Sequence, residues 1–295
     1  MGPTASGKSA LALELARRLP GPPVELVSVD SMQVYRGMDV GTAKPTPAER
    51  EEAPHHLLDL ADPAEDFSLT RFQQAFAEAM DGIEQRGHRA LLVGGTGLYI
   101  RAVVDGLTPP GQWPDVKAEL EAEPDTTTLY ARLAGLDPIA AQRMEPTNRR
   151  RVLRALEVSV GSGRPFSSFG PGLDAHPPTR FRMAGVWLPR PVLNERIEHR
   201  VHGMVEQGLA EEAGRLAGRP EGLSRTARQA LGYKEFLDGL NPDDAARETV
   251  RRTKAFARRQ RMWFRRDPRI TWFGARTNPF AVLPALLGDW SQCPS

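Results

Sequence analysis

The chain has 295 residues, 40% of them hydrophobic and 26% charged, which predicts roughly two domains or one domain with a large insertion and excludes a disordered chain. A single cysteine excludes an internal disulfide framework, and without a secretory signal or an apolar run of about 18 residues we expect a cytoplasmic protein with no membrane partner. The net charge of +2 is unevenly divided: ten Lys and Arg residues stand against two carboxylates in residues 247–269, which predicts an anionic partner for that segment.

The chain opens on a glycine-rich loop, GPTASGKS, that leads into an amphipathic helix. The loop fits G-x-x-x-x-G-K-[ST], a pattern in which backbone N–H groups and a helix N-terminus converge on phosphate oxygens. The lysine adds a positive charge, and the final hydroxyl can ligate Mg²⁺, so Ser9 is the predicted metal ligand. The predicted phosphate-binding residues are Gly2, Pro3, Thr4, Ala5, Ser6, Gly7, Lys8 and Ser9.

Two strands with a helix between them come next. Residues 24–29, VELVSV, are β-rich, residues 68–84 have a helical pattern, and residues 90–95, ALLVGG, form the continuous apolar run of a buried parallel strand. This alternation predicts an α/β fold with a P-loop NTPase-like parallel sheet flanked by helices. A buried strand normally precedes a phosphate loop. We therefore expect the native protein to carry about 5–15 further residues before Gly2, including a strand of roughly five.

Asp30 is the one carboxylate that directly ends an apolar strand. A turn or N-cap role is the simpler interpretation. At the carboxyl edge of a parallel sheet, beside a phosphate loop, it can instead act as a general base or hold a metal. The later strand ends in Gly94, Gly95 and Thr96, where a motor-type ATPase usually carries an acid, and the N-K-x-D motif of a GTPase is absent. For His55 and His56 we expect a turn or packing role.

The second half of the chain changes character twice. Residues 113–160 predict helices broken by prolines, and a linker rich in Gly, Ser and Pro follows at 161–178. Residues 183–188 and 270–273 resume a strand pattern, with helical sequence between them. We predict a discontinuous core, residues 1–112 and 178–295, interrupted by a helical insertion at 113–177.

The basic segment predicts a helix with its charges on one face. Its Lys and Arg residues step by three and four, and almost no acids intervene to form i,i+4 pairs. A solvated surface face is the ordinary alternative, whereas a stripe of one sign is typical of nucleic-acid binding. The stripe comprises Arg251, Lys254, Arg258, Arg261 and Arg265. A second basic cluster in the insertion comprises Arg149, Arg150, Arg151 and Arg154.

Six sequence blocks together carry a family resemblance that covers nearly the whole chain. They are GPTASGKS (2–9), VDSMQVYRGMDVGTAKP (29–45), PHHLLD (54–59), VGGTGLY (93–99), QALGYKEF (229–236) and ARRQRMWFR (257–265). This combination resembles the bacterial tRNA dimethylallyltransferases. The resemblance implies a monomeric enzyme that transfers a dimethylallyl group from dimethylallyl diphosphate to tRNA. The acceptor would be the exocyclic amine of the adenosine immediately 3′ of the anticodon, in the anticodon stem-loop.

The resemblance also implies roles for individual residues. Asp30 would be the general base for the adenine amine, and Thr96 would contact the bridging-oxygen region of the diphosphate held by the glycine-rich loop with Mg²⁺. The residues that would lie against a flipped-out base are Ser31, Met32 and Gln33. The other residues that would contact tRNA are Lys117, Arg150, Arg151, Arg154, Gln229, Gly232, Tyr233, Lys234, Arg251, Arg258 and Arg265.

One departure from the family pattern and two alternative functions stay open at this point. Some family members carry an arginine at the position of Gln229 that contacts the diphosphate, so Arg228 or another cation must take that role here. A P-loop nucleoside or small-molecule kinase would share the loop and strand order, but it has no need of the basic stripe or the insertion. A non-enzymatic RNA-binding ATPase module is a third hypothesis, which Asp30 and Thr96 beside the phosphate loop disfavour.

Overall fold

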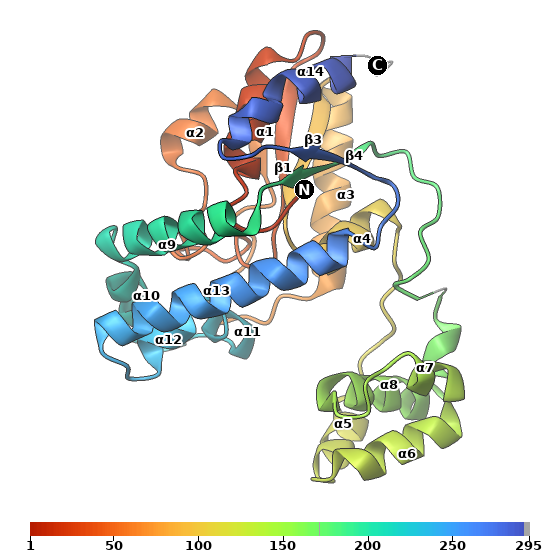
Figure 1. Cartoon of the computed structure of the whole chain (residues 1–295). Helices are drawn as coiled ribbons and strands as arrows, with labels where there is room; N and C mark the ends of the chain where they lie inside the picture. Colours follow the sequence, from red (N-terminus) through yellow and green to blue (C-terminus); the bar gives the residue numbers. More distant parts are fainter. Residues whose placement is uncertain (171, 292–295) are drawn as a thin grey trace. The chain divides into compact units, whose positions relative to one another are not determined.

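The computed structural model describes residues 1–170 and 172–291, which form two compact units (Figure 1). The first unit is discontinuous and comprises Met1–Val104 and Thr179–Ser295. The second unit is Asp105–Pro178. No described helix is both long enough and apolar enough to cross a membrane.

The first junction between the units lies eight residues before the predicted one, and the second lies one residue after it. The early junction has a local cause. The backbone N–H of Trp113 donates to Glu157 at 2.9 Å, and the Arg154 guanidinium donates to the carbonyls of Pro110 and Gly111. The segment before residue 113 is therefore held by the second unit.

The first unit is built from strands and helices in alternation, as the sequence predicts. Its N-terminal part contains α1 (Lys8–Arg18), β1 (Val24–Val29), α2 (Pro47–Glu52), β2 (His55–His56), α3 (Leu69–Gln85), β3 (Arg89–Gly94) and α4 (Gly97–Val104). Its C-terminal part contains β4 (Met183–Trp187), α9 (Arg190–Glu206), α10 (Leu209–Ala217), α11 (Arg225–Arg228), α12 (Tyr233–Leu237), α13 (Pro242–Phe264), β5 (Ile270–Gly274), the 3-10 turn η2 (Pro279–Val282) and α14 (Leu283–Ser291).

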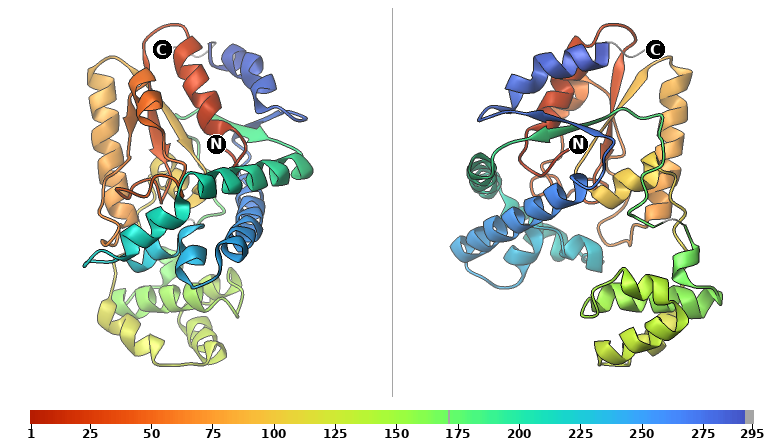
Figure 2. Two further views of the ribbon diagram at one scale, coloured as in Figure 1. Left: turned by 90° about the vertical axis from the view of Figure 1, so that its left-hand side faces the viewer. Right: turned by 45° about the vertical axis from the view of Figure 1, so that its right-hand side comes forward.

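The main sheet is parallel and has the order β2-β1-β3. Strand β1 pairs with β3 along its whole length, from Val24 opposite Arg89 to Val29 opposite Gly94. Helices α1 and α3 cover opposite faces of this sheet (Figure 2), so every residue of β1 is buried. The predicted α/β fold with a helix-flanked parallel sheet is confirmed.

A second parallel sheet contains only β4 and β5, so the single sheet expected from the sequence is divided. Met1 lies beside β4: its amine donates to the Ala184 carbonyl at 2.6 Å, and its own carbonyl accepts from the Val186 N–H at 3.0 Å. A cavity of about 280 Å³ is lined by Met1 and by residues of β3 and β4. The strand expected before Gly2 stays a prediction.

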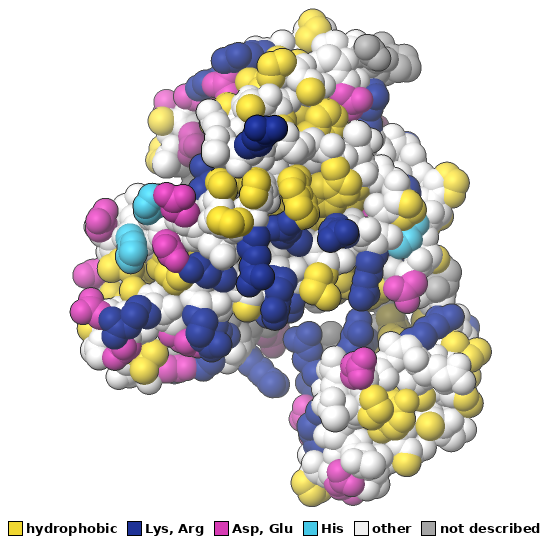
Figure 3. Space-filling model, viewed as in Figure 1, with side chains coloured by type: hydrophobic (Ala, Val, Ile, Leu, Met, Phe, Trp, Pro, Cys, Tyr) yellow, Lys and Arg dark blue, Asp and Glu magenta, His cyan; other side chains and the backbone are white. Residues whose placement is uncertain are grey.

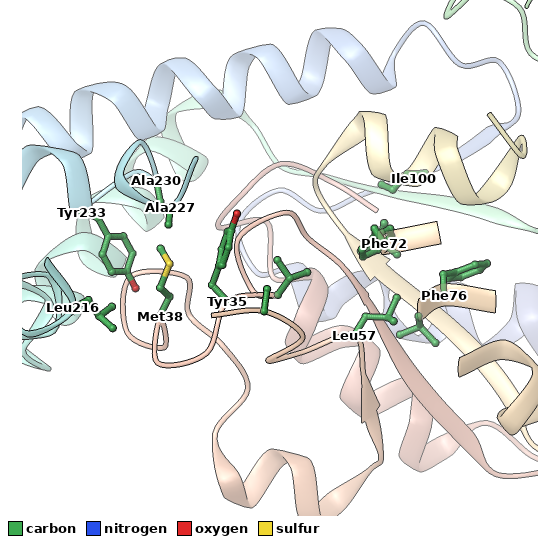
Figure 4. Close-up of a cluster of buried hydrophobic side chains, with 14 of the residues drawn as sticks. Tyr35, Met38, Leu57, Phe72, Phe76, Ile100, Leu216, Ala227, Ala230 and Tyr233 are labelled. Carbon is green, nitrogen blue, oxygen red and sulfur yellow. The ribbon is translucent and has the colours of Figure 1, made fainter. Parts of the chain in front are cut away.

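The largest apolar core joins the α3 face of the sheet to the helices that follow β4 (Figure 4). Phe72 and Phe76 of α3 contribute from one side, and Leu216 of α10 contributes from the other. Tyr35 and Met38, which lie in the loop after β1, are fully buried between them. This loop is therefore packed as core rather than exposed.

The second unit is a small helical domain with its own core. Its elements are α5 (Pro114–Glu121), α6 (Thr126–Leu136), α7 (Pro138–Gln142), α8 (Arg149–Ser162) and the 3-10 turn η1 (Phe166–Ser168). Proline occupies the first turn of α5 and α7, where its missing N–H costs no hydrogen bond. The core of this domain includes Leu120, Leu129, Leu133, Val152 and Leu156.

One carboxylate is buried among basic side chains at the start of the main sheet. Glu25 of β1 is 2% exposed and accepts two hydrogen bonds from Arg86, each 2.8 Å long. His56 and His88 lie 2.5 and 2.6 Å from its two oxygens, which gives His56 the packing role expected for it. The hydrogen bonds from Arg86, followed by those from the two histidines, lower the pKa of Glu25 to about 2 despite its burial.

This lowered pKa predicts a stability that depends on pH. The carboxylate stabilises the fold fully above the ordinary glutamate pKa of 4.5, and the contribution is lost as pH falls from there toward 2. We expect Glu25→Gln to lower the free energy of unfolding by about 3 kcal/mol at pH 7 and by less than half as much at pH 3. Urea unfolding at both pH values measures this, with exposed Glu51→Gln as control. An equal loss at both pH values would contradict the assignment.

Candidate active site

The carboxyl ends of β1 and β3 bring two predicted catalytic residues together. The pairing of Val29 with Gly94 is so close that a Cβ on Gly94 would lie 2.1 Å from the Val29 carbonyl oxygen. Beyond it, the Thr96 hydroxyl accepts a hydrogen bond from the Ser31 N–H at 3.2 Å and lies 3.4 Å from the Ser31 hydroxyl. The residue that follows Asp30 is thus tied directly to Thr96.

Asp30 serves as a turn residue with one of its two carboxylate oxygens. Its Oδ1 accepts from the backbone N–H groups of Met32 at 2.9 Å and Gln33 at 3.4 Å. Within the described part of the chain, Oδ2 has no hydrogen-bond partner. The turn interpretation is therefore confirmed, and it leaves a fixed carboxylate with one oxygen available for proton transfer.

The glycine-rich loop has the backbone form of an anion site. Ala5 and Gly7 have φ angles of 61° and 85°, and the N–H groups of Ala5, Gly7 and Lys8 have no acceptor among the described residues. Successive N–H groups in such turns make a concave site for anions. The Ala5 carbonyl accepts from Arg196 of α9 at 2.8 Å, which holds the loop from outside.

Two cations stand beside this loop and face Asp30. Burial and, less strongly, the neighbouring Arg200 lower the pKa of Lys8 to about 8, although Asp30 acts in the opposite direction. Burial also lowers the pKa of Arg200, again opposed by Asp30. No described residue forms a hydrogen bond or salt bridge with the Arg200 guanidinium. Two partly buried cations with one nearby carboxylate make a site that favours a further anion.

Arg200 was not predicted from the sequence. Gln229 is exposed at the end of α11, and the guanidinium of Arg228 lies 3.9 Å from Asp238 and 3.5 Å from the Leu237 carbonyl. Among the described contacts, neither residue forms a hydrogen bond or an ion pair with the phosphate loop. The only signal for Arg200 is its position one helical turn after Arg196 on α9, which also faces the loop.

A buried carboxylate and a buried amine shape the loop that follows Asp30. Glu212 of α10 accepts from the N–H groups of Asp39, Val40 and Gly41 and from the Tyr233 hydroxyl, at 3.0–3.1 Å and 2.5 Å respectively. The Lys44 amine, 1% exposed, contacts Asp39, Asp59 and the Tyr35 carbonyl, each at 2.7 Å. These contacts give structural roles to several residues of the sequence block that follows Asp30.

Two residues predicted to contact tRNA are instead buried around this loop. Tyr233 is 0% exposed, and a Cβ on Gly41 would lie 2.4 Å from its ring. Gly232 is also buried, and its N–H donates to Glu235 at 2.8 Å. These residues hold the loop and its supporting helices rather than touching a partner. Lys234 is partly exposed and pairs with Asp238.

Of the three residues predicted to lie against the base, only Ser31 has its side chain beside Thr96. The Gln33 amide donates to the Thr42 and Ala43 carbonyls, both at 3.2 Å, and accepts from the Ser28 hydroxyl at 2.8 Å. Met32 packs against the main core. The side chain of Gln33 therefore braces the loop, and its contact with the base stays a prediction.

The basic stripe lies on α13, and Lys and Arg side chains gather over this helix on the surface shown in Figure 3. Arg251, Arg258 and Arg265 are exposed, as predicted. The expectation of few acidic partners is wrong at two positions: Arg251 pairs with Glu248 at 2.6 Å, and Lys254 pairs with Glu198. Arg261 lies over the Trp187 ring, 3.6 Å from its centroid.

The second unit keeps part of its predicted basic surface. Lys117 of α5 is exposed, 3.9 Å from Glu121, and Arg150 and Arg151 of α8 are exposed. The predicted tRNA contact of Arg154 does not agree with the structure. Its guanidinium bonds to Glu157 at 2.9 Å and to the carbonyls of Pro110 and Gly111. It holds the unit together and is not free for a phosphate.

Comparison with known proteins identifies the family. The family model described as IPP transferase matches residues 33–267. The tRNA dimethylallyltransferase of Pseudarthrobacter chlorophenolicus is 47% identical over 279 residues, 92% of this chain and 91% of the relative. The full-length tRNA isopentenylpyrophosphate transferase of Bacillus halodurans matches with a TM-score of 0.70 and 38% identity, over 98% of this chain and 93% of that one. A eukaryotic dimethylallyltransferase acting on tRNA matches with a TM-score of 0.75 and 27% identity, over 93% and 72%. The resemblance carried by the six sequence blocks is thus confirmed, and the chain belongs to the IPP transferase family.

Proposed function

We propose that the protein transfers a dimethylallyl group from dimethylallyl diphosphate to the exocyclic amine of the adenosine immediately 3′ of the anticodon in tRNA. The observation that carries this proposal is the placement of Asp30 and Thr96 at one sheet edge, with Lys8 and Arg200 beside them. Such a site can hold a diphosphate and accept a proton within the same small volume. Membership of the IPP transferase family supports this chemistry over a small-molecule kinase.

The glycine-rich loop would stabilise a leaving group in this reaction. Breaking the bond between the allylic carbon and the bridging oxygen leaves negative charge on the diphosphate. The free N–H groups of Ala5, Gly7 and Lys8, together with the Lys8 and Arg200 charges, are preorganised for that charge. The Thr96 hydroxyl, which accepts from the Ser31 N–H, can donate its own proton toward the bridging oxygen.

Asp30 would complete the reaction as the proton acceptor. The amine lone pair forms the new bond to the allylic carbon, the electrons of the carbon–oxygen bond leave with the diphosphate, and the amine proton passes to Asp30 Oδ2. The turn hydrogen bonds on Oδ1 fix the carboxylate during this step. An adenine stacked in an anticodon loop cannot reach a carboxylate at this edge, so the base must be extruded first.

Mg²⁺ is the cofactor that the phosphate loop implies. Ser9 is exposed in the first turn of α1, where its hydroxyl can ligate a magnesium ion that also contacts the diphosphate. Among the described residues, no group of three or more acidic, His or Cys side chains is arranged to hold a metal ion. Mg²⁺ usually keeps water and phosphate ligands, which the diphosphate would supply here. When bound, the ion would neutralise charge on the departing diphosphate.

The tRNA would be bound through the exposed arginines of α13. Arg258 and Arg265 have no hydrogen-bond or ion-pair partner among the described residues, so both are available to backbone phosphates. Lys117, Arg150 and Arg151 of the second unit are further candidates. A monomeric state and a cytoplasmic location stay predictions from the sequence.

The reaction is tested with labelled dimethylallyl diphosphate and an unmodified tRNA that carries adenosine 3′ of the anticodon. We expect the wild-type chain to label the tRNA and Asp30→Asn to lower the single-turnover rate by about 10²–10⁴-fold. The asparagine oxygen can still accept from the Met32 N–H, so the turn and tRNA binding should persist. Exposed Asp243→Asn is the control. A near-normal rate in Asp30→Asn would leave Asp30 as a turn residue only.

Arg200 is expected to be the cation that replaces the family arginine at Gln229. Because a charge-assisted hydrogen bond contributes about 1.5–3 kcal/mol, Arg200→Gln should weaken the binding of inorganic diphosphate by about 10–100-fold. Titration calorimetry in the absence of tRNA measures this. Arg228→Gln, which changes the charge equally, should have little effect. Equal losses in the two variants would show that net charge, and not Arg200, governs the affinity.

The exposed face of α13 is tested by salt dependence. Replacing Arg251, Arg258 and Arg265 with Gln should weaken tRNA binding and reduce the slope of log K against log salt by about 0.7–0.9 for each lost phosphate contact. Diphosphate binding should not change. The control replaces the exposed residues Arg18, Arg180 and Arg215 with Gln and removes the same charge. An unaltered slope in the α13 variant would show that the stripe is a solvated face.

A further inference from the structure

A single buried side chain bridges the two loops of the site. Gln260 of α13 is 7% exposed, and both ends of its amide are used. Its Oε1 accepts from the Thr4 N–H at 2.8 Å, and its Nε2 donates to the Gly95 carbonyl at 2.8 Å. The amide therefore spans from the phosphate loop to the residue before Thr96.

Close packing around Gln260 fixes the distance between α13 and the segment that carries Thr96. A Cβ on Gly95 would lie 2.6 Å from the Gln260 amide nitrogen. A Cβ on Gly97 would lie 2.2 Å from the indole nitrogen of Trp263, which is three residues further along α13. Side chains at these two positions would push α13 away, so the glycines on both sides of Thr96 seat the helix against this segment.

The bridge also removes one donor from the phosphate loop. Because the Thr4 N–H bonds to Gln260, it is not available to a phosphate, which corrects its predicted role as a phosphate-binding backbone group. The N–H groups of Ala5, Gly7 and Lys8 remain available. Gln260 thus shapes the loop without occupying the diphosphate position itself.

We propose that Gln260 is a positioning residue that sets the separation between the diphosphate held by the loop and the Thr96 hydroxyl. This inference rests on the proposed function and deepens it. In the reaction proposed above, the Thr96 hydroxyl must meet the bridging oxygen of a diphosphate held by the phosphate loop, which lies far from Thr96 in the sequence. A displacement of about 1 Å between such groups can cost about 10²-fold in rate. The same helix carries Arg258 on its exposed face and is followed directly by Arg265, so one rigid element links the proposed tRNA surface to both loops.

Two substitutions separate this role from general packing. Gln260→Met keeps the length and loses both hydrogen bonds, whereas Gln260→Asn keeps the amide and is one methylene too short to span the loops. The matched control is Thr249→Val, a buried polar residue of α13 whose hydroxyl bonds only to the Ala245 carbonyl of its own helix.

We expect both Gln260 variants to lower kcat by about 10–100-fold while KM for tRNA and for dimethylallyl diphosphate changes by less than about threefold. Thr249→Val should keep the wild-type kcat. Amide hydrogen exchange provides a readout that does not depend on turnover: the Thr4 amide should exchange faster in both Gln260 variants and not in Thr249→Val.

The outcomes distinguish failure of this inference from failure of the proposed function. Wild-type protein that transfers no dimethylallyl group contradicts the proposed function. In that case the hydrogen-exchange rate of the Thr4 amide still tests whether Gln260 bridges the two loops. Active wild-type protein with unchanged kcat in Gln260→Met and Gln260→Asn overturns the positioning role. A loss confined to KM, or an equal loss of kcat in Thr249→Val, also overturns it, because either result assigns the effect to binding or to helix stability.

Discussion

The parallel pairing of β1 with β3 is the constraint on which the site depends. Both strands end at the same edge of the sheet, and the contact of Val29 with Gly94 leaves no room for a side chain at the latter position. Asp30 and Thr96 follow directly and are joined through Ser31. A proton acceptor from one strand and a hydroxyl from the other are therefore brought together by backbone geometry before any substrate is bound.

The electrostatics of the site complement that geometry. Lys8 and Arg200 are partly buried near Asp30, and no described side chain other than Asp30 offsets their charge. Elsewhere in the unit buried charges are neutralised locally, as Lys44 is by Asp39 and Asp59. The difference indicates where an anionic ligand belongs. Cation excess at the phosphate loop is a property of the assembled fold, because α1 and α9 are far apart in sequence.

Many residues in the diagnostic sequence blocks support the site without touching a substrate. Glu212 caps three consecutive N–H groups of the loop after β1, and Tyr233 bonds to the same carboxylate. Gln33 braces that loop through two of its carbonyls. Gln33 and Tyr233 look like binding residues in the sequence because they are polar and lie in specific motifs. The hydrogen bonds of Gln33 and the burial of Tyr233 and Glu212 indicate that they stabilise the conformation in which Asp30 and Ser31 are presented.

The sequence by itself determined the strands at 24–29 and 90–95, the phosphate loop, the basic helix and the helical insertion, because each depends on local periodicity or on a short motif. It also placed Asp30 and Thr96 at strand ends. Only the tertiary structure decided that Arg200 stands at the loop, that Gln260 bridges Thr4 to Gly95, and that Tyr233 is internal. These facts depend on contacts between segments more than 160 residues apart in sequence, which no local pattern encodes.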